Sequence, residues 1–232
     1  MTFDEAPPPC QSATFSVRYR VMSTTTALRA DSPGKFLEKL PVGSYVHVDQ
    51  LPGTPNAAKS AASRAATRGD LIALRRGLYY KGKRTRYGAV TPPAEDVALE
   101  VLGRKGVGPT GVWAAHVLNL TTQLPAVPEL VTSGPIPTGV RGVLVHKRNN
   151  VARRDLNYAE IAVLEVLRDW DYTTESTWDG VVAAVRERVE GRQVRPNKLA
   201  AAARGERKPH VRARLRELFA ALELTTPASV AW

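Results

Sequence analysis

The chain has 232 residues, 43% of them hydrophobic, and its 33 Lys and Arg outnumber 22 Asp and Glu to give a formal net charge of +11. This apolar content suffices for a folded core and excludes a disordered basic tail, and the length allows one domain or two small ones. The single cysteine, Cys10, excludes intramolecular disulfides and cysteine-ligated zinc. Because no run of about 18 apolar residues and no signal-peptide pattern occurs, we expect a cytoplasmic protein without a membrane span.

We expect three parts along the chain. Residues 1–30 lack hydrophobic periodicity and are predicted to be a flexible leader, in which Met22 is an alternative start to Met1. A first domain is expected in 31–90 and a second in 91–232, because the character of the sequence changes at their boundary.

Local signals predict the elements of the first domain. A proline directly follows Ser32 and Thr54, and this pair of residues is typical of a helix start. We therefore expect a short helix that ends at Pro41 and a longer helix that runs to about Thr67. Residues 45–51, between the two helices, are compatible with a short strand leading into a helical turn.

The two faces of the longer helix differ in chemistry. Small residues at helical spacing are expected to pack against a neighbouring helix, as in a helix-turn-helix pair: Ala57, Ala58, Ala61, Ala62 and Ala65. The opposite stripe consists of residues that donate hydrogen bonds to phosphates and base edges: Asn56, Lys59, Ser60, Ser63, Arg64 and Thr67. An ordinary solvated face has a similar pattern, so the stripe alone leaves both interpretations open.

The residues after this helix favour DNA binding. Two short β-type runs, 71–74 and 77–81, are separated by a pair of arginines. A hairpin with arginines at its tip, directly after a candidate recognition helix, predicts the wing of a winged helix-turn-helix. Residues 56–90 also hold nine basic residues and one acidic residue. The predicted DNA-contacting residues are Asn56, Lys59, Ser60, Ser63, Arg64, Arg68, Arg75, Arg76, Lys81, Lys83, Arg84 and Arg86.

A small sheet and several helices are expected in the second domain, which makes the whole chain an α+β protein. A proline-rich linker, 91–95, precedes a helix that stops at Gly103, and the glycine-containing stretch from there to Gly108 is predicted to be a loop. The expected strands are 129–132 and 143–146, and the expected helices are 97–102, 110–118, a buried 157–169, 178–189 with a capping box from Ser176 and Asp179, 197–203 and 209–224.

A second basic cluster lies near the C-terminus. Its members are Arg204, Arg207, Lys208, Arg212, Arg214 and Arg216. Contact with a nucleic acid and an ordinary solvated helix surface both explain such a cluster, and the sequence leaves the two interpretations open.

No pattern of residues requires catalysis. The four histidines are far apart in sequence and belong to no H-E-x-x-H or Cys/His arrangement, so no metal site is expected. Asp169 and Asp171 are close enough in sequence to hold magnesium ions, but they follow a helix end rather than lie on a strand, so we interpret them as a polar helix terminus. We therefore expect no cofactor and no catalytic residue.

Several short motifs resemble those of a known family. They are RRGLYY at 75–80, PPAED at 92–96 and, chiefly, LNLTTQLPA at 118–126 leading into LVTSG at 130–134. Over about residues 32–224 the chain thereby resembles the AbiEi family, the antitoxins of type IV toxin–antitoxin systems. The resemblance implies a winged-helix DNA-binding domain joined to an α/β antitoxin domain. It also implies binding to inverted repeats in the protein's own promoter, repression of that operon, and neutralisation of a cognate nucleotidyltransferase toxin, without implying direct contact with that toxin.

Two other classes of protein are also compatible with the sequence. The first is a winged-helix regulator whose C-terminal domain binds a ligand or dimerises and has no toxin partner. The second is an enzyme, such as a nuclease with a winged targeting domain. The nuclease fits less well, because the expected Asp…Glu-x-Lys metal cluster is missing from residues 91–232.

Overall fold

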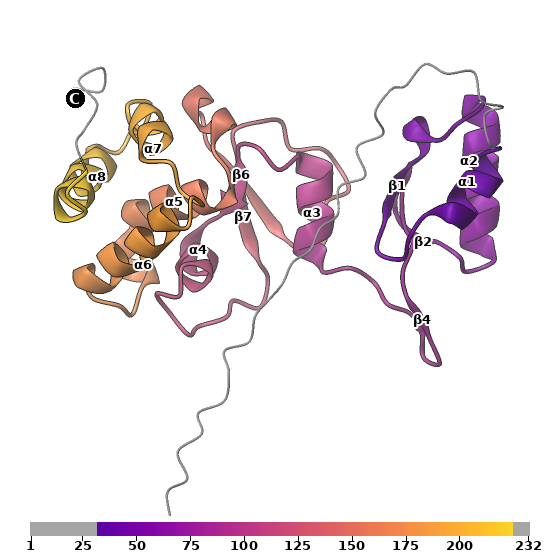
Figure 1. Cartoon of the computed structure of the whole chain (residues 1–232), viewed down its shortest axis with the longest axis horizontal. Coiled ribbons are helices and arrows are strands. Elements are labelled where there is room, and N and C mark those ends of the chain that lie inside the picture. The colour runs from indigo at the N-terminus through magenta and orange to yellow at the C-terminus, as the bar shows by residue number, and fades with distance from the viewer. Residues whose placement is uncertain (1–31, 225–232) are drawn as a thin grey trace, which may run out of the picture.

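The computed structural model describes residues 32–224, and the predicted leader 1–30, with Cys10 and Met22, lies outside the described residues. Helices and short strands mix in an α+β fold, as expected from the sequence. Figure 1 shows the elements before residue 90 packed apart from those that follow. Between residues 32 and 224, no helix has both the length and the apolar character needed to cross a membrane.

The N-terminal elements follow the predicted order. They are α1 (Pro33–Lys39), β1 (Tyr45–His47), the 3-10 helix η1 (Val48–Gln50), α2 (Pro55–Thr67), β2 (Ile72–Arg75) and β3 (Leu78–Tyr80). The three strands form an antiparallel sheet in the order β1-β3-β2. The helix start predicted at Thr54 is confirmed, because the Thr54 hydroxyl accepts a hydrogen bond from the Ala57 amide.

Helix α2 packs on α1 and the sheet through small side chains. Its buried residues are Ala58, Ala61, Ala62 and Ala65. Ala57, predicted for the same face, is exposed instead. At 3.6 residues per turn, Ala57 lies about 90° from the middle of the buried stripe, so it falls at the edge of the packed face.

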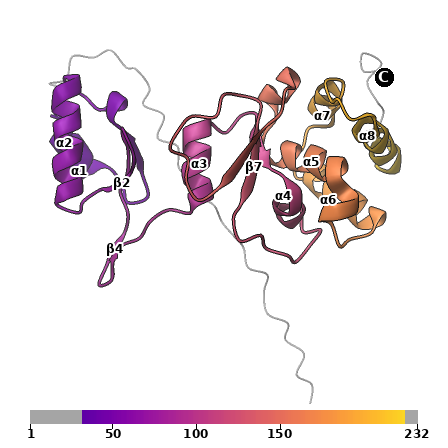
Figure 2. The same cartoon turned by 180° about the vertical axis from the view of Figure 1, so that it is seen from behind.

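A second hairpin, absent from the predicted elements, follows β3. Strands β4 (Arg84–Thr85) and β5 (Gly88–Ala89) pair in antiparallel fashion, with Arg86 and Tyr87 at the turn between them. Figures 1 and 2 show this hairpin projecting away from the elements on either side of it. We call residues 83–90 the finger.

The remaining elements surround a second three-stranded sheet. They are α3 (Ala94–Leu102), β6 (Val107–Pro109), α4 (Gly111–Val117), β7 (Glu129–Thr132), β8 (Leu144–Lys147), the 3-10 helix η2 (Val151–Asp155), α5 (Tyr158–Thr173), α6 (Trp178–Glu190), α7 (Pro196–Ala203) and α8 (Pro209–Ala221). In the sheet order β6-β7-β8, β7 is antiparallel to β6 and parallel to β8. Helix α3 covers one face of this sheet, and α4 and α5 cover the other (Figures 1 and 2).

Strand β6 lies within the stretch predicted to be a loop, which corrects that prediction for Val107 and Gly108. Both residues are buried. A Cβ atom at Gly108 would lie 2.6 Å from Cβ of Ile161 in α5. Glycine is therefore required by the close approach of a helix to the strand and not by a turn.

The buried helix predicted at 157–169 is confirmed, and α5 continues to Thr173 beyond a kink at Asp169, whose φ and ψ are not helical. All residues of α5 from Ile161 to Leu167 are buried. Its start is a capping box, in which Asn157 and Glu160 each accept a hydrogen bond from the other's backbone amide. This helix is the centre of the larger hydrophobic core.

The start of α6 differs from the prediction. The expected capping box of Ser176 and Asp179 does not form, because the Ser176 hydroxyl donates a hydrogen bond to the Leu120 carbonyl oxygen. Thr177 caps the helix instead, by accepting a hydrogen bond from the Gly180 amide. The positions predicted for the last two helices agree with α7 and α8 to within a few residues.

A network of buried charges fastens α5 to its surroundings. The Glu165 carboxylate lies 2.7 Å from the Arg148 guanidinium and 2.5 Å from the Arg153 guanidinium, and it accepts a 2.5 Å hydrogen bond from the Thr110 hydroxyl. Arg153, only 1% exposed, also contacts Glu206 at 2.6 Å. Since these five residues come from different segments, the network joins the sheet, α5 and the loop between α7 and α8.

Candidate nucleic-acid interface

The outer face of α2 is accessible along its whole length. Its exposed residues are Asn56, Lys59, Ser60, Ser63, Arg64 and Thr67, as the helical spacing predicts. Within residues 32–224, neither the Lys59 ammonium group nor the Arg64 guanidinium group has an ion-pair or hydrogen-bond partner. This face therefore presents cations and hydrogen-bond donors that the fold itself does not use.

The turn of the β2–β3 hairpin is shifted by one residue from its predicted position. Arg75 is the last residue of β2 and pairs with Leu78, so the turn consists of Arg76 and Gly77 rather than of the two arginines. Gly77 has a φ of +79°, which glycine adopts without strain. Arg76 is exposed and Arg75 is half-buried. The Gly77 carbonyl oxygen accepts a 3.0 Å hydrogen bond from the Val48 amide, so the turn is held against η1.

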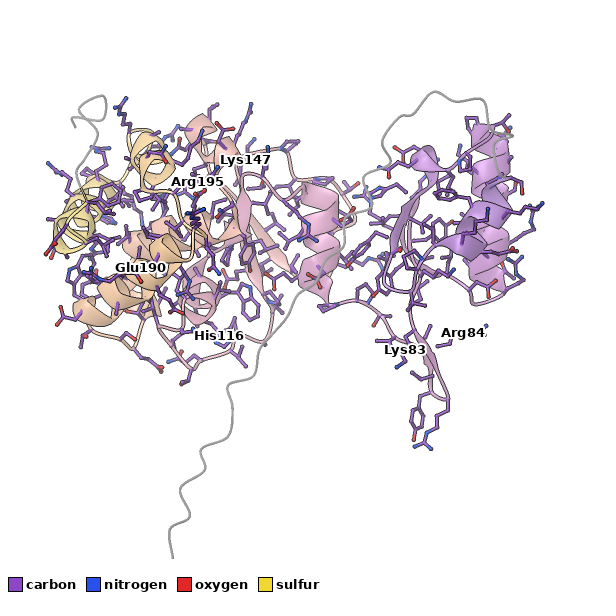
Figure 3. The ribbon with its side chains drawn as sticks, in the orientation of Figure 1. Lys83, Arg84, His116, Lys147, Glu190 and Arg195 are labelled. Atoms are coloured by element: carbon purple, nitrogen blue, oxygen red, sulfur yellow. The ribbon has the colours of Figure 1, made fainter. Side chains whose placement is uncertain are left out.

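The finger is the projecting basic hairpin of the N-terminal part, and Figure 3 marks Lys83 at its base. The Val90 amide donates a 2.9 Å hydrogen bond to the Lys83 carbonyl oxygen and closes this base. Near the tip, the Thr85 hydroxyl donates to the Gly88 carbonyl oxygen at 2.8 Å and accepts from the Tyr87 amide at 3.2 Å. The finger is thus an ordered hairpin with internal hydrogen bonds at both ends.

Three of the nine basic residues in 56–90 have partners within the protein. The Lys81 ammonium group donates to two carbonyl oxygens at the C-terminal end of α1, at 2.9 Å each, and so caps that helix. Arg68 and Arg84 lie 2.9 and 3.7 Å from the carboxylate of Asp70. Six have no ion-pair partner in the part of the chain that the structure describes: Lys59, Arg64, Arg75, Arg76, Lys83 and Arg86.

Tyr87 belongs to this surface but is not among the DNA-contacting residues predicted from the sequence. It is 84% exposed, and the Arg86 guanidinium lies 4.6 Å from the centre of its ring. The available signal was an arginine and an aromatic residue followed by Gly88, a spacing compatible with a two-residue hairpin turn. Paired strands of only two residues each are too short for any alternation of polar and apolar residues to reveal them.

The C-terminal basic cluster is largely engaged within the molecule. Lys208 lies 3.0 Å from Asp169, and Arg214 lies 2.6 Å from Asp171. The Arg212 guanidinium donates to a backbone carbonyl oxygen of the preceding loop. These contacts favour the interpretation of an ordinary helix surface, and they make the two aspartates ion-pair partners for the last helix.

In residues 32–224, no group of three or more His, Cys, Asp or Glu side chains is placed to hold a metal ion. His47 and His146 instead contact carboxylates of neighbouring segments. The His47 ring lies 2.9 Å from Glu100 of α3, and this hydrogen bond raises the pKa of His47. The His146 ring lies 3.0 Å from Glu129 of β7. The first of these contacts links the N-terminal sheet to α3.

Comparison with known proteins identifies a family whose description names no activity. Residues 34–155 match a family described as "Family of unknown function (DUF6088)". None of the curated proteins matches the sequence. Among solved structures, the chain is similar to the "Crystal structure of RV2827C protein from Mycobacterium tuberculosis", with 14% sequence identity and a TM-score of 0.46, over 83% of this chain and 76% of that chain.

Proposed function

The chain belongs to the DUF6088 family of unknown function, and we propose that it is a double-stranded DNA-binding transcriptional repressor whose N-terminal part is a winged helix-turn-helix. The observation that carries this proposal is the exposed face of α2. Its cations Lys59 and Arg64 have no partner among residues 32–224, and the chain continues from α2 into two hairpins that carry further basic residues without an ion-pair partner in the described part of the chain. A positively charged surface whose cations have no partner within the described part of the protein is suited to bind a polyanion.

The dimensions of α2 suit the major groove of B-form DNA. Its 13 residues span about 20 Å, and the groove is about 12 Å wide and admits an α-helix. Asn56 can read an adenine edge, and Lys59 and Arg64 can read guanine edges or contact phosphates. The order of helix, strand, helical turn, α2 and hairpin supports the proposed winged helix-turn-helix, in which η1 would take the place of the middle helix.

Contacts to the DNA backbone are assigned to Arg75 and Arg76. Replacing both with alanine is expected to weaken binding to all DNA sequences alike and to lower the slope of log K against log salt by roughly 0.9 for each phosphate that the variant no longer neutralises. Gel-shift titrations at several salt concentrations measure both effects, on the DNA upstream of the protein's own gene and on an unrelated fragment. Exposed Arg207 and Arg216, replaced together, remove the same charge elsewhere and serve as the control.

An unchanged affinity and an unchanged salt slope in the variant lacking Arg75 and Arg76 would exclude the β2–β3 hairpin from the interface. A loss confined to one DNA sequence would instead assign these arginines to base edges. Equal losses in the control variant would mean that net charge, or contact through the C-terminal basic cluster, matters as much to the affinity as the hairpin does.

The resemblance to the AbiEi family extends the proposal to residues 91–232, which we assign the neutralisation of a nucleotidyltransferase toxin encoded by a neighbouring gene. Co-expression of the two genes is expected to relieve the growth arrest that the neighbouring gene causes alone. The variant lacking Arg75 and Arg76 should relieve the arrest equally when both genes are under a foreign promoter, because neutralisation does not need operator binding. Arrest that persists beside the wild-type protein contradicts the antitoxin assignment and leaves a DNA-binding regulator without a toxin partner.

A further inference from the structure

We infer that Tyr87, at the tip of the finger, inserts into the minor groove beside the site read by α2 and bends the DNA there. This inference rests on the proposed function, since it assumes that α2 occupies the major groove. It adds a contact of a different kind: an aromatic wedge in place of a cation or a hydrogen-bond donor.

The exposure of Tyr87 has no explanation within the described fold. Its side chain is 84% exposed, at the end of a hairpin that projects from the rest of the molecule (Figure 1). A tyrosine buries a large apolar area when it packs, and an exposed hairpin turn does not need one. In the structure its ring contacts the Arg86 guanidinium, 4.6 Å from the ring centre. The tip thus pairs an aromatic ring with a cation, a combination suited to bases and phosphates.

The finger is ordered before any partner binds. The Thr85 hydroxyl is hydrogen-bonded on both sides of the turn, and the Val90 amide closes the base. Gly82 precedes the finger, and a Cβ atom there would lie 2.5 Å from the Val90 carbonyl oxygen and 2.8 Å from Ile72 Cδ1. The base is therefore packed too tightly against β2 for any larger residue, which fixes the direction of the hairpin and lowers the entropy lost on binding.

The position of the finger suits a groove next to the one that α2 would occupy. Arg84 at its base lies 3.7 Å from Asp70, in the turn that follows α2. From Lys83 to Tyr87 an extended chain covers about 13 Å, or roughly four base-pair steps. The minor groove is about 6 Å wide, too narrow for a two-stranded hairpin with its side chains, so only the side chains at the tip can enter.

A ring wedged into the minor groove unstacks a base step in part and bends the duplex towards the major groove. At the step that the ring enters, the major groove lies on the far side of the duplex, so the bend is directed away from the finger. Arg86 would follow the ring into the groove, where the negative potential of A·T-rich sequence attracts a guanidinium group. The finger would thereby favour flexible, A·T-rich steps beside the bases that α2 reads.

The test uses the full chain and circularly permuted fragments of the DNA upstream of its own gene, whose gel mobility reports the bend. With wild-type protein, the gel mobility of the complex should depend on where the binding site lies within the fragment. The Tyr87→Ala variant should bind with an affinity reduced about tenfold or less and lose the position dependence, while Tyr87→Phe should keep it. Tyr172→Ala, which removes a tyrosine that is 88% exposed on α5, should match wild type.

The salt dependence of DNA binding distinguishes the contribution of the Tyr87 ring from that of the Arg86 charge. Tyr87→Ala should leave the slope of log K against log salt unchanged, and Arg86→Ala should lower it by about one. Wild-type protein that binds without bending, or a Tyr87→Ala variant that bends as wild type does, would overturn the wedge and leave the proposed function standing. A wild-type protein that binds no DNA at all would overturn both.

Discussion

Replacing Lys59 or Arg64 with alanine is expected to reduce the affinity for the DNA upstream of the protein's own gene by roughly 5- to 150-fold, or about 1–3 kcal/mol for each base contact, with little change on unrelated DNA. Both side chains are exposed and unpaired in the described part of the chain, so their loss removes contacts with DNA and none within the protein. The ratio of the two dissociation constants, measured by gel shift at one salt concentration, tests this prediction.

Stability should not fall in these variants, because alanine is the better helix former at an exposed position. Thermal melts of each variant check this, and Arg216→Ala, on an exposed face of α8, is the matched control for loss of one helical cation. Equal losses of affinity for both DNAs would mean that Lys59 and Arg64 contact phosphates and not base edges. Affinity unchanged on both would remove α2 from the interface.

The elements predicted correctly were those with strong local signals. Helix α2 follows Thr54 and Pro55, and its alanines leave one packing face, so its bounds depend on residues close together in sequence. The two-residue strands of the finger depend instead on Gly82. Only glycine fits at this position, because Ile72 and Val90 would clash with a side chain. A contact of this kind joins separate segments and has no local signature, so the finger was missed.

The same reason explains which partners within the protein the sequence did not reveal. Lys81 was predicted from its charge to contact DNA, and nothing in the sequence indicates that its ammonium group also caps α1, more than 40 residues earlier in the chain. Gly108 was predicted to lie in a loop because glycine is common there, whereas Ile161 of α5 requires it in a strand. In each case the residue type was informative, and the partner that explains it became visible only with the fold.

The buried charges around α5 show most clearly what could not be predicted from the sequence. Glu165 lies in a helix that the sequence predicted to be buried, but the sequence identified neither Arg148 nor Arg153 as its partner. Burial raises the pKa of Glu165, but the hydrogen bond from Arg148 and the positive charges of Arg153 and Arg148 outweigh this and lower it to about 2. The carboxylate is therefore ionised inside the core, where removal of its charge leaves cations uncompensated.

Glu165→Gln is accordingly expected to destabilise the protein by about 3–5 kcal/mol at neutral pH, because Arg153 is almost fully buried and loses one of its two carboxylate partners. Denaturant unfolding followed by circular dichroism measures this. The matched control is Asp155→Ala, which removes a carboxylate that is 75% exposed and 3.5 Å from Lys198 and should cost less than about 1 kcal/mol. A loss in the Glu165→Gln variant no larger than in this control would show that the network contributes little.

The pH dependence of the protein's stability tests the same prediction independently. Since folding lowers the pKa of Glu165 from 4.5 to about 2, the stability that its charge supplies is complete above pH 4.5 and is lost as the pH falls towards 2. The difference in melting temperature between wild type and Glu165→Gln should therefore be constant near neutral pH and shrink below about pH 4.5. A difference that stays constant down to pH 2 would mean that the glutamine acts through altered packing, and the role of the buried charge would have to be abandoned.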